Sequence, residues 1–181
     1  MGILLAFAPF IAFAVIDRFF GATAGLSAGA LVSAALLVRD FASARAPKIL
    51  EIGTFVLFAG MALFVLFGDA RWSVVGVRLR VDAGLLAIVL VSMAARQPFT
   101  LQYARERVDR ELWSHPAFLR TNYVITGAWA LAFGVMVVAD LVMLYLPQVP
   151  IQVGILATVA ALVGAVKFTS WYPQRSVAGK A

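Results

Sequence analysis

Cysteine is absent from the 181-residue sequence, and histidine occurs once, at His115. The lack of cysteine excludes a disulfide framework, a thiolate nucleophile and a Cys-ligated metal, and a single histidine leaves no ordinary zinc site. The sequence also contains no Gly-x-x-x-x-Gly-Lys phosphate loop. We therefore expect no metal, no cofactor and no catalytic residue, and we expect that the protein is not an enzyme.

Charged residues are also scarce, at 13% of the chain, whereas 63% is hydrophobic and the mean hydropathy is +0.95. A soluble domain is usually about 25% charged and about 45–50% apolar. The apolar excess is too large for one globular core and predicts a polytopic membrane protein. The net charge of +6 comes from basic residues between apolar segments. Membrane topology explains that charge, so no nucleic-acid partner is expected.

The apolar residues fall into six segments, which predict an all-α polytopic membrane helix bundle with six spans, forming a single domain over residues 1–181. A spanning helix needs roughly 20 mainly apolar residues. The six segments are residues 3–20, 22–38, 49–67, 79–95, 123–146 and 153–168. The fourth is the weakest, because only residues 83–95 lack charge and Arg78 and Arg80 must reach the membrane interface. The alternative is five spans, with the first two segments forming a re-entrant hairpin.

The distribution of basic residues predicts the orientation of these spans. With six spans, eleven Lys and Arg lie on one side of the membrane and four lie on the other, at Arg18, Arg71, Arg78 and Arg80. The side richer in basic residues faces the cytoplasm, so we expect both termini there. The first segment lacks the basic start of a signal peptide, so we interpret it as a retained helix.

Residues 96–120 form the longest polar stretch and are expected to be a cytoplasmic loop. Within it an apolar face predicts an amphipathic surface helix over residues 100–113, capped by Thr100, with aromatic side chains at headgroup depth. That apolar face consists of Leu101, Ala104, Val108 and Leu112, and the aromatic residues are Phe99, Tyr103 and Trp113. His115 before a proline predicts the N-cap of the next span. The loop's candidate functional residues are Arg96, Gln102, Tyr103 and Arg105.

Two shorter regions receive predictions of their own. Apolar and charged residues alternate over residues 77–82, which predicts a short extended piece in the loop 69–82. Residues 173–181 are short and polar, and we expect them to be a mobile tail.

Ionisable groups inside apolar segments are costly in lipid and often mark functional sites. The fifth segment carries such a group at the end of a polar and aromatic stripe with helical spacing. This 122–140 stripe consists of Asn122, Thr126, Trp129, Phe133, Met136 and Asp140. It is either a packing seam or the wall of a small-molecule or lipid site. We expect Asp140 to pair with Arg18 or, as second choice, Arg80, and Glu51 is a further candidate.

The second segment carries small residues at every fourth position, namely Gly21, Gly25, Gly29 and Ser33. Small residues at this spacing let helices approach closely in lipid, where packing drives association. The pattern predicts a close helix contact within the bundle, and a homodimer seam is the alternative.

Several motifs resemble the intracellular septation protein A family, the YciB-type inner-membrane proteins. The resemblance covers most of the chain and is carried by FAPFIAF, FGDARW, ARQPFTLQYARERV, ELWSHPAF and TNYVITGAWALAFGVMVVAD. In the last of these motifs the family has Asn eleven residues after the Trp, where this chain has Asp140 eleven residues after Trp129. The resemblance implies a bacterial inner-membrane protein that serves cell division and envelope upkeep through protein partners, without catalytic residues.

Two functions of different classes follow. The first is a structural or interaction protein of the cell envelope, with membrane lipid and envelope or division proteins as partners. The alternative is a small-molecule or lipid-binding membrane protein or transporter subunit, with its site beside the 122–140 stripe. An enzyme acting on lipid is the least favoured class, because no acid–base constellation is visible.

Overall fold

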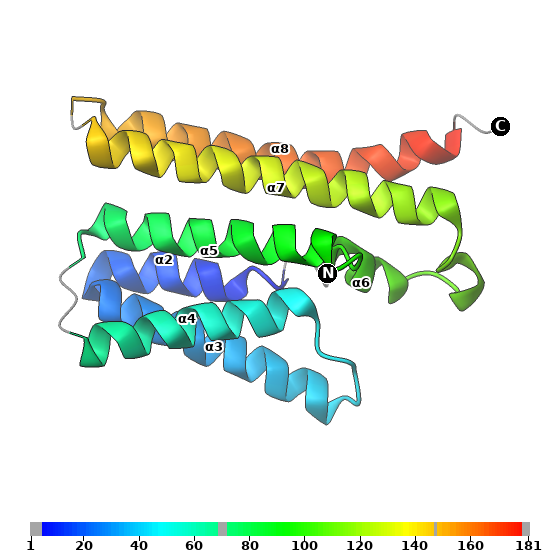
Figure 1. Cartoon of the computed structure of the whole chain (residues 1–181), viewed down its shortest axis with the longest axis horizontal. Coiled ribbons are helices and arrows are strands. Elements are labelled where there is room, and N and C mark those ends of the chain that lie inside the picture. The colour runs from blue at the N-terminus through cyan, green and yellow to red at the C-terminus, as the bar shows by residue number, and fades with distance from the viewer. Residues whose placement is uncertain (1–4, 69–71, 147, 179–181) are drawn as a thin grey trace. The chain divides into compact units, whose positions relative to one another are not determined.

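The computed structural model describes residues 5–68, 72–146 and 148–178, with side chains to Gln174 (Figure 1). Helices make up nearly all of these ranges, which contain no strand. The helices are α2 (Ala8–Phe20), α3 (Ala22–Ala42), α4 (Ile49–Phe67), α5 (Val74–Ala94), α6 (Phe99–Arg105), the 3-10 turn η1 (Arg110–Leu112), α7 (Pro116–Tyr145) and α8 (Ile151–Ala178). The predicted all-α fold class is confirmed.

Four helices of the described chain are long and apolar enough to cross a membrane, which indicates a membrane-embedded protein. They are α3, α4, α7 and the Ile151–Gln174 part of α8. Helix α2 has 13 residues, or about 20 Å at about 1.5 Å per residue, against a hydrocarbon core of about 30 Å. Helix α5 has 21 residues but contains Arg78, Arg80 and Asp82. Neither α2 nor α5 therefore qualifies by length and composition alone.

The predicted extended piece at residues 77–82 is wrong, because these residues lie inside α5. The Ser73 hydroxyl accepts a hydrogen bond of 3.1 Å from the Gly76 N–H at the start of the helix. Val77 and Val81 are both buried. Two residues that are four apart share a helical face as well as a strand face, so six alternating residues fit either structure. Residues 69–71 of the same loop lie outside the described residues.

Helix α8 continues through Pro173 to Ala178, so the first part of the predicted tail is helical, and its mobility stays a prediction. The remaining three residues, 179–181, lie outside the described residues, as does Pro147, which follows the fifth segment. The helix passes the end of the apolar segment at Phe168, since apolarity marks where a helix crosses lipid and says little about where it stops.

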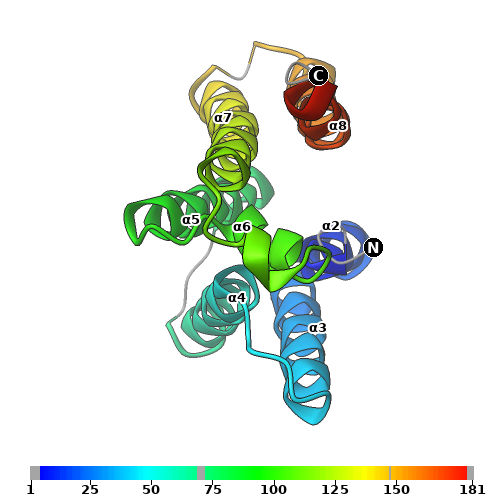
Figure 2. The ribbon, with the colours of Figure 1, turned by 90° about the vertical axis from the view of Figure 1, so that its right-hand side faces the viewer.

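Contacts divide the chain into two compact units, Met1–Ile88 and Val89–Ala181. The prediction of a single domain stays a prediction. In the first unit α3 lies beside both α2 and α4 (Figure 2). Its core consists of Phe13, Leu26, Phe58, Ala62, Val77 and Val81. The Phe58 ring is central, with its centroid 5.6 Å from that of Phe13 and 5.1 Å from that of Phe10.

The small residues of α3 lie at these helix contacts. A Cβ at Gly25 would lie 2.8 Å from the Asp17 Cβ on α2, and one at Gly29 would lie 2.7 Å from the Phe58 ring on α4. Both distances are too short, so a methyl group would force the helices apart. Gly21 does not make the close helix contact that we expected, since a Cβ there would meet no atom within 4 Å. Gly21 instead lies in the turn between α2 and α3 with a φ of 86°, which glycine adopts readily.

In the second unit α7 and α8 form an antiparallel hairpin, and α6 packs on α7 (Figure 1). Near the hairpin turn Gly154 leaves room for the Met143 side chain. An aromatic run links α6 to α7, because the Phe99 ring meets Trp129 edge-on at 6.4 Å and Trp129 lies 5.6 Å from Phe133. These ring contacts hold α6 against the inward face of α7.

Candidate functional site

The 122–140 stripe forms one buried face of α7. Thr126 and Asp140 have no exposed surface, and Phe133 and Trp129 have at most 2%. Asn122 and Met136 are also buried. The spacing of four and three residues therefore located the inward face of this helix.

The polar groups at the start of the stripe bind within the protein. The Thr100 hydroxyl on α6 donates to the Asn122 carbonyl at 3.0 Å and lies 2.7 Å from the Thr126 hydroxyl. A hydroxyl has one proton, so when Thr100 donates to the carbonyl, Thr126 must donate to Thr100. The Asn122 side-chain amide donates to the Phe118 carbonyl at 2.9 Å. Thr100 thus binds α6 to α7 instead of capping α6, where Pro98 occupies the N-cap.

A second relay binds α7 to α8. The Trp129 indole N–H donates to the Thr169 hydroxyl at 2.9 Å, and that hydroxyl donates to the Ala165 carbonyl at 2.8 Å. In lipid an unsatisfied indole N–H would cost several kcal/mol. Thr169 was not predicted from the sequence, because its partner lies 40 residues away along the chain and no local pattern links the two.

The predicted pairing of Asp140 joins residues of different units, so it stays a prediction. Arg18 lies exposed in the last turn of α2. Arg80 is exposed on α5, where its guanidinium donates to the Gly76 carbonyl at 2.7 Å and lies 4.3 Å from the centre of the Trp72 ring. Arg80 therefore already has a carbonyl and an aromatic face as partners within its own unit.

The predicted amphipathic helix over residues 100–113 is wrong in both length and exposure. Helix α6 ends at Arg105 and buries Phe99 and Tyr103, which we had expected at headgroup depth. Trp113 ends the polar turn that follows, because its indole donates to the Val108 carbonyl at 3.2 Å. A continuous helix would use that carbonyl for a backbone N–H four residues later.

The candidate residues of the loop occupy different environments. Arg96 has a φ of 57° in the turn before α6, Gln102 is half-buried, and Tyr103 is buried. The Arg105 guanidinium lies 5.3 Å from the centre of the Trp113 ring. The N-cap prediction for His115 is confirmed, since its side chain accepts from the Ala117 N–H at 3.3 Å at the start of α7.

The first unit contains a charged cluster of which only Glu51 was a candidate from the sequence. This α3–α4 charged cluster consists of Arg39, Asp40, Lys48 and Glu51. The Lys48 ammonium lies 2.9 Å from an Asp40 carboxylate oxygen and 3.5 Å from one of Glu51. The Arg39 guanidinium lies 2.6 Å from the other Asp40 oxygen. Asp40, Lys48 and Glu51 are all buried.

This arrangement balances two carboxylates against two cations where α3 ends and α4 begins. Buried charges are tolerated when they are paired and hydrogen-bonded. The cluster therefore fixes the two helix ends around the connection between them. A sequence signal did exist, since Asp40 ends one apolar segment and Lys48 and Glu51, three residues apart, begin the next.

The run Gly25-Leu26-Ser27-Ala28-Gly29 matches the Gly-x-Ser-x-Gly nucleophile motif. That motif needs a strand, a sharp turn and a helix, so that the serine is presented on the turn. Here all five residues lie within α3. The pattern therefore belongs to helix packing and does not form a nucleophile elbow.

Comparisons with protein-family models, with curated proteins and with solved structures found no match to this chain. The resemblance to the intracellular septation protein A family thus depends on the sequence motifs alone. Within the described ranges no group of three or more His, Cys, Asp or Glu could hold a metal ion. The polar groups that the structure brings together hold helices to one another through hydrogen bonds and ion pairs.

Proposed function

We propose that the protein is a non-enzymatic integral protein of the bacterial inner membrane that supports cell division and envelope maintenance through protein partners. One observation carries this proposal. Three polar residues of the 122–140 stripe, Asn122, Thr126 and Trp129, bind other protein groups, as in the contact of 2.7 Å between Thr126 and Thr100 and that of 2.9 Å between Trp129 and Thr169. Such a stripe serves packing, which leaves the outward helix surfaces for partners.

The topology belongs to the same proposal. Six spans add α2 and α5 to the four apolar helices, and both termini lie in the cytoplasm. The eleven-to-four distribution of Lys and Arg supports this orientation. The α3–α4 charged cluster then lies at the cytoplasmic surface, where water solvates the partly exposed Arg39.

The alternative, a binder or transporter with its site beside the stripe, has less support. A ligand there would need polar groups that are available to it, whereas Thr126 and Trp129 each have a protein partner. Binding would have to break those hydrogen bonds at a cost of about 1–3 kcal/mol for each group left unsatisfied.

Deletion and complementation test the proposed function. We expect cells lacking the gene to differ from the parent in length and septum frequency, and the wild-type gene to restore both. The double variant Leu131→Ala and Val138→Ala changes two exposed side chains of α7. It should reach the membrane at wild-type level and fail to restore division.

Two results would contradict the proposal. One is a deletion strain with normal length, septation and osmotic resistance. The other is full complementation by the α7 surface variant together with a growth defect that a single added nutrient cures, since that pattern indicates uptake.

A further inference from the structure

The charged residues of α5 lie in its first half. Arg78, Arg80 and Asp82 lie there, and residues 83–94 contain no charge. Those uncharged residues cover about 18 Å at about 1.5 Å per residue, whereas a hydrocarbon core is about 30 Å thick. Helix α5 can therefore cross a bilayer only if its charged groups have partners or reach the membrane surface.

The Arg80 side chain is folded back toward the start of α5. Its guanidinium donates to the Gly76 carbonyl at 2.7 Å, one turn earlier, and lies 4.3 Å from the centre of the Trp72 ring. That ring is stacked on Phe64 of α4, with the ring centres 5.2 Å apart and the planes 14° apart. A Cβ at Gly76 would lie 3.2 Å from a guanidinium nitrogen, so glycine leaves room for the arginine. The Phe64–Trp72–Arg80 stack joins the last turn of α4 to the start of α5.

The other two charges of α5 have opposite signs. Arg78 and Asp82 are four residues apart, so they share a helix face on which opposite charges attract. Asp82 is buried, and the Arg78 guanidinium also attracts the Asp17 carboxylate of α2. Both helices contribute to the core of the first unit. Carboxylates of this unit therefore balance Arg78, whereas Arg80 depends on the Gly76 carbonyl and the Trp72 ring.

We propose that the Phe64–Trp72–Arg80 stack decides whether α5 crosses the membrane. With the guanidinium held at the level of Gly76, the rest of the helix, residues 77–94, is about 27 Å long at about 1.5 Å per residue. That length is close to the hydrocarbon core of about 30 Å. Tryptophan and arginine both suit the membrane interface, where an apolar body meets lipid and a polar end meets water. This inference rests on the six-span topology of the proposed function.

Thiol labelling of the full chain in intact cells tests the proposal. Ser114 is exposed in the loop after α5, and Ser114→Cys changes no charge. When α5 crosses, a membrane-impermeant maleimide cannot reach this thiol; when α5 fails to cross, the loop stays in the periplasm and is labelled. We expect Trp72→Leu to raise the labelled fraction about tenfold, which corresponds to about 1.4 kcal/mol, in the range of one cation–π contact. Trp72→Phe keeps an aromatic ring and should stay near the wild-type level.

Two further variants separate the charge from the ring. Adding Arg80→Leu to Trp72→Leu removes the charge that the ring holds, so it should restore protection of the thiol. Gly76→Val disturbs the same contact from the other side, because its side chain would meet the guanidinium. It should raise labelling with the tryptophan intact, and it serves as the test if Trp72→Leu does not accumulate.

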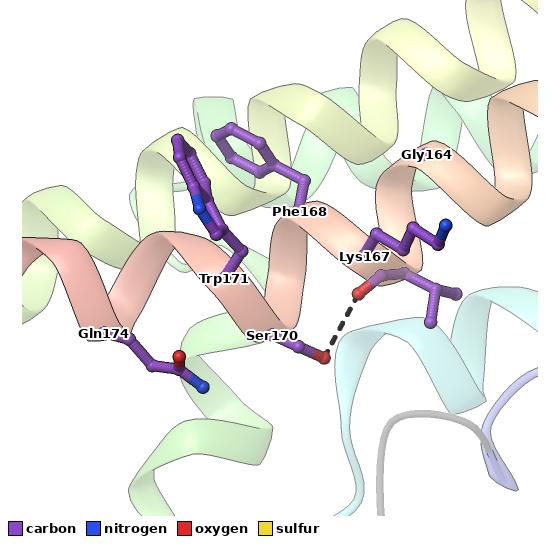
Figure 3. A pocket seen from close by; sticks show the side chains of 7 residues that line it. Gly164, Lys167, Phe168, Ser170, Trp171 and Gln174 are labelled. Carbon is purple, nitrogen blue, oxygen red and sulfur yellow. Dashed lines mark hydrogen bonds between the residues drawn. The ribbon is translucent and has the colours of Figure 1, made fainter.

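The matched control is Trp171→Leu, which removes a tryptophan from α8. Trp171 is 47% exposed, and its ring centre lies 6.0 Å from that of Phe168. Both residues line an open pocket on α8, in which the Lys167 side chain points away from the Trp171 ring (Figure 3). This control should leave labelling of Ser114→Cys at the wild-type level.

Three outcomes would overturn the proposal while the six-span topology stands. They are full protection of the thiol in both Trp72→Leu and Gly76→Val, equal labelling in Trp72→Leu and Trp171→Leu, and labelling in Trp72→Leu that Arg80→Leu does not reverse. Labelling of Ser114→Cys in the otherwise unchanged chain is a different result. It would contradict the six-span topology itself, and this proposal with it.

Discussion

The Lys48 ammonium lies between the Asp40 and Glu51 carboxylates, and none of the three residues is more than 5% exposed. Removing the cation takes away the ion-pair partner that the Asp40 and Glu51 carboxylates share, while the partly exposed Arg39 stays beside Asp40. We predict that Lys48→Met lowers the free energy of unfolding by about 3–5 kcal/mol. The control Arg45→Met, at an exposed position of the same loop, should have little effect. Thermal unfolding in detergent measures both variants.

Rescue distinguishes lost pairing from lost packing. Adding Asp40→Asn and Glu51→Gln to Lys48→Met removes the uncompensated charges, so the triple variant should be more stable than the single one. A triple variant that is less stable than Lys48→Met would mean that the ion pairs do not determine the stability of the cluster.

The close approach of α3 to α2 depends on the missing side chain of Gly25, since a Cβ there would lie 3.0 Å from backbone atoms of Asp17. Backbone cannot move aside as a side chain can, so Gly25→Ala should destabilise the first unit by about 1–3 kcal/mol. The control Gly60→Ala places a methyl group in open space on α4. Alanine has a higher helix propensity than glycine, so this change should be neutral or stabilising. Equal melting temperatures for the two variants would count against the predicted contact.

At the scale of elements, α6 is held to α7 by hydroxyl groups. Thr100→Val removes the donor to the Asn122 carbonyl and the partner of the fully buried Thr126 hydroxyl. Thr126→Val leaves the bond from Thr100 to the carbonyl intact. We therefore predict that Thr100→Val is the more harmful change, at about 1–3 kcal/mol. The exposed Ser170→Ala serves as the control, and unfolding in detergent is the measurement.

A double-mutant cycle completes this prediction. If the two hydroxyls bind each other, the double variant should cost less than the sum of the single changes, because no hydroxyl is then left buried alone. Additive costs would mean that the distance of 2.7 Å carries no interaction energy.

The sequence predicted the elements that periodicity and apolarity define. Residues 49–67 form α4 as predicted, and the 122–140 stripe is the buried face of α7. It did not predict that α6 ends at Arg105. The Trp113 indole binds the Val108 carbonyl, which a continuing helix would need for a backbone N–H, and helical spacing alone does not predict this contact. The α3–α4 charged cluster was missed because its Asp40 and Lys48 are eight residues apart across a loop.

At the scale of the whole molecule, the proposed function requires a polytopic chain whose loops alternate between the two sides of the membrane. Four helices qualify as spans by length and apolarity. A topology with these four spans and the proposed topology with six spans place the same loop on different sides of the membrane. With six spans the loop containing Arg45 is cytoplasmic, and the start of α5 at Val74 is on the other side. With four spans and a cytoplasmic C-terminus, the loop containing Arg45 is periplasmic instead.

Cysteine accessibility decides between these topologies, and the chain provides a clean background because it has no cysteine of its own. Arg45 and Val74 are both exposed, so a thiol at either position can react. We predict that a membrane-impermeant maleimide labels Val74→Cys in intact bacterial cells and labels Arg45→Cys only after the inner membrane is permeabilised. Labelling of Arg45→Cys in intact cells would contradict the six-span topology and, with it, the orientation on which the proposed function depends.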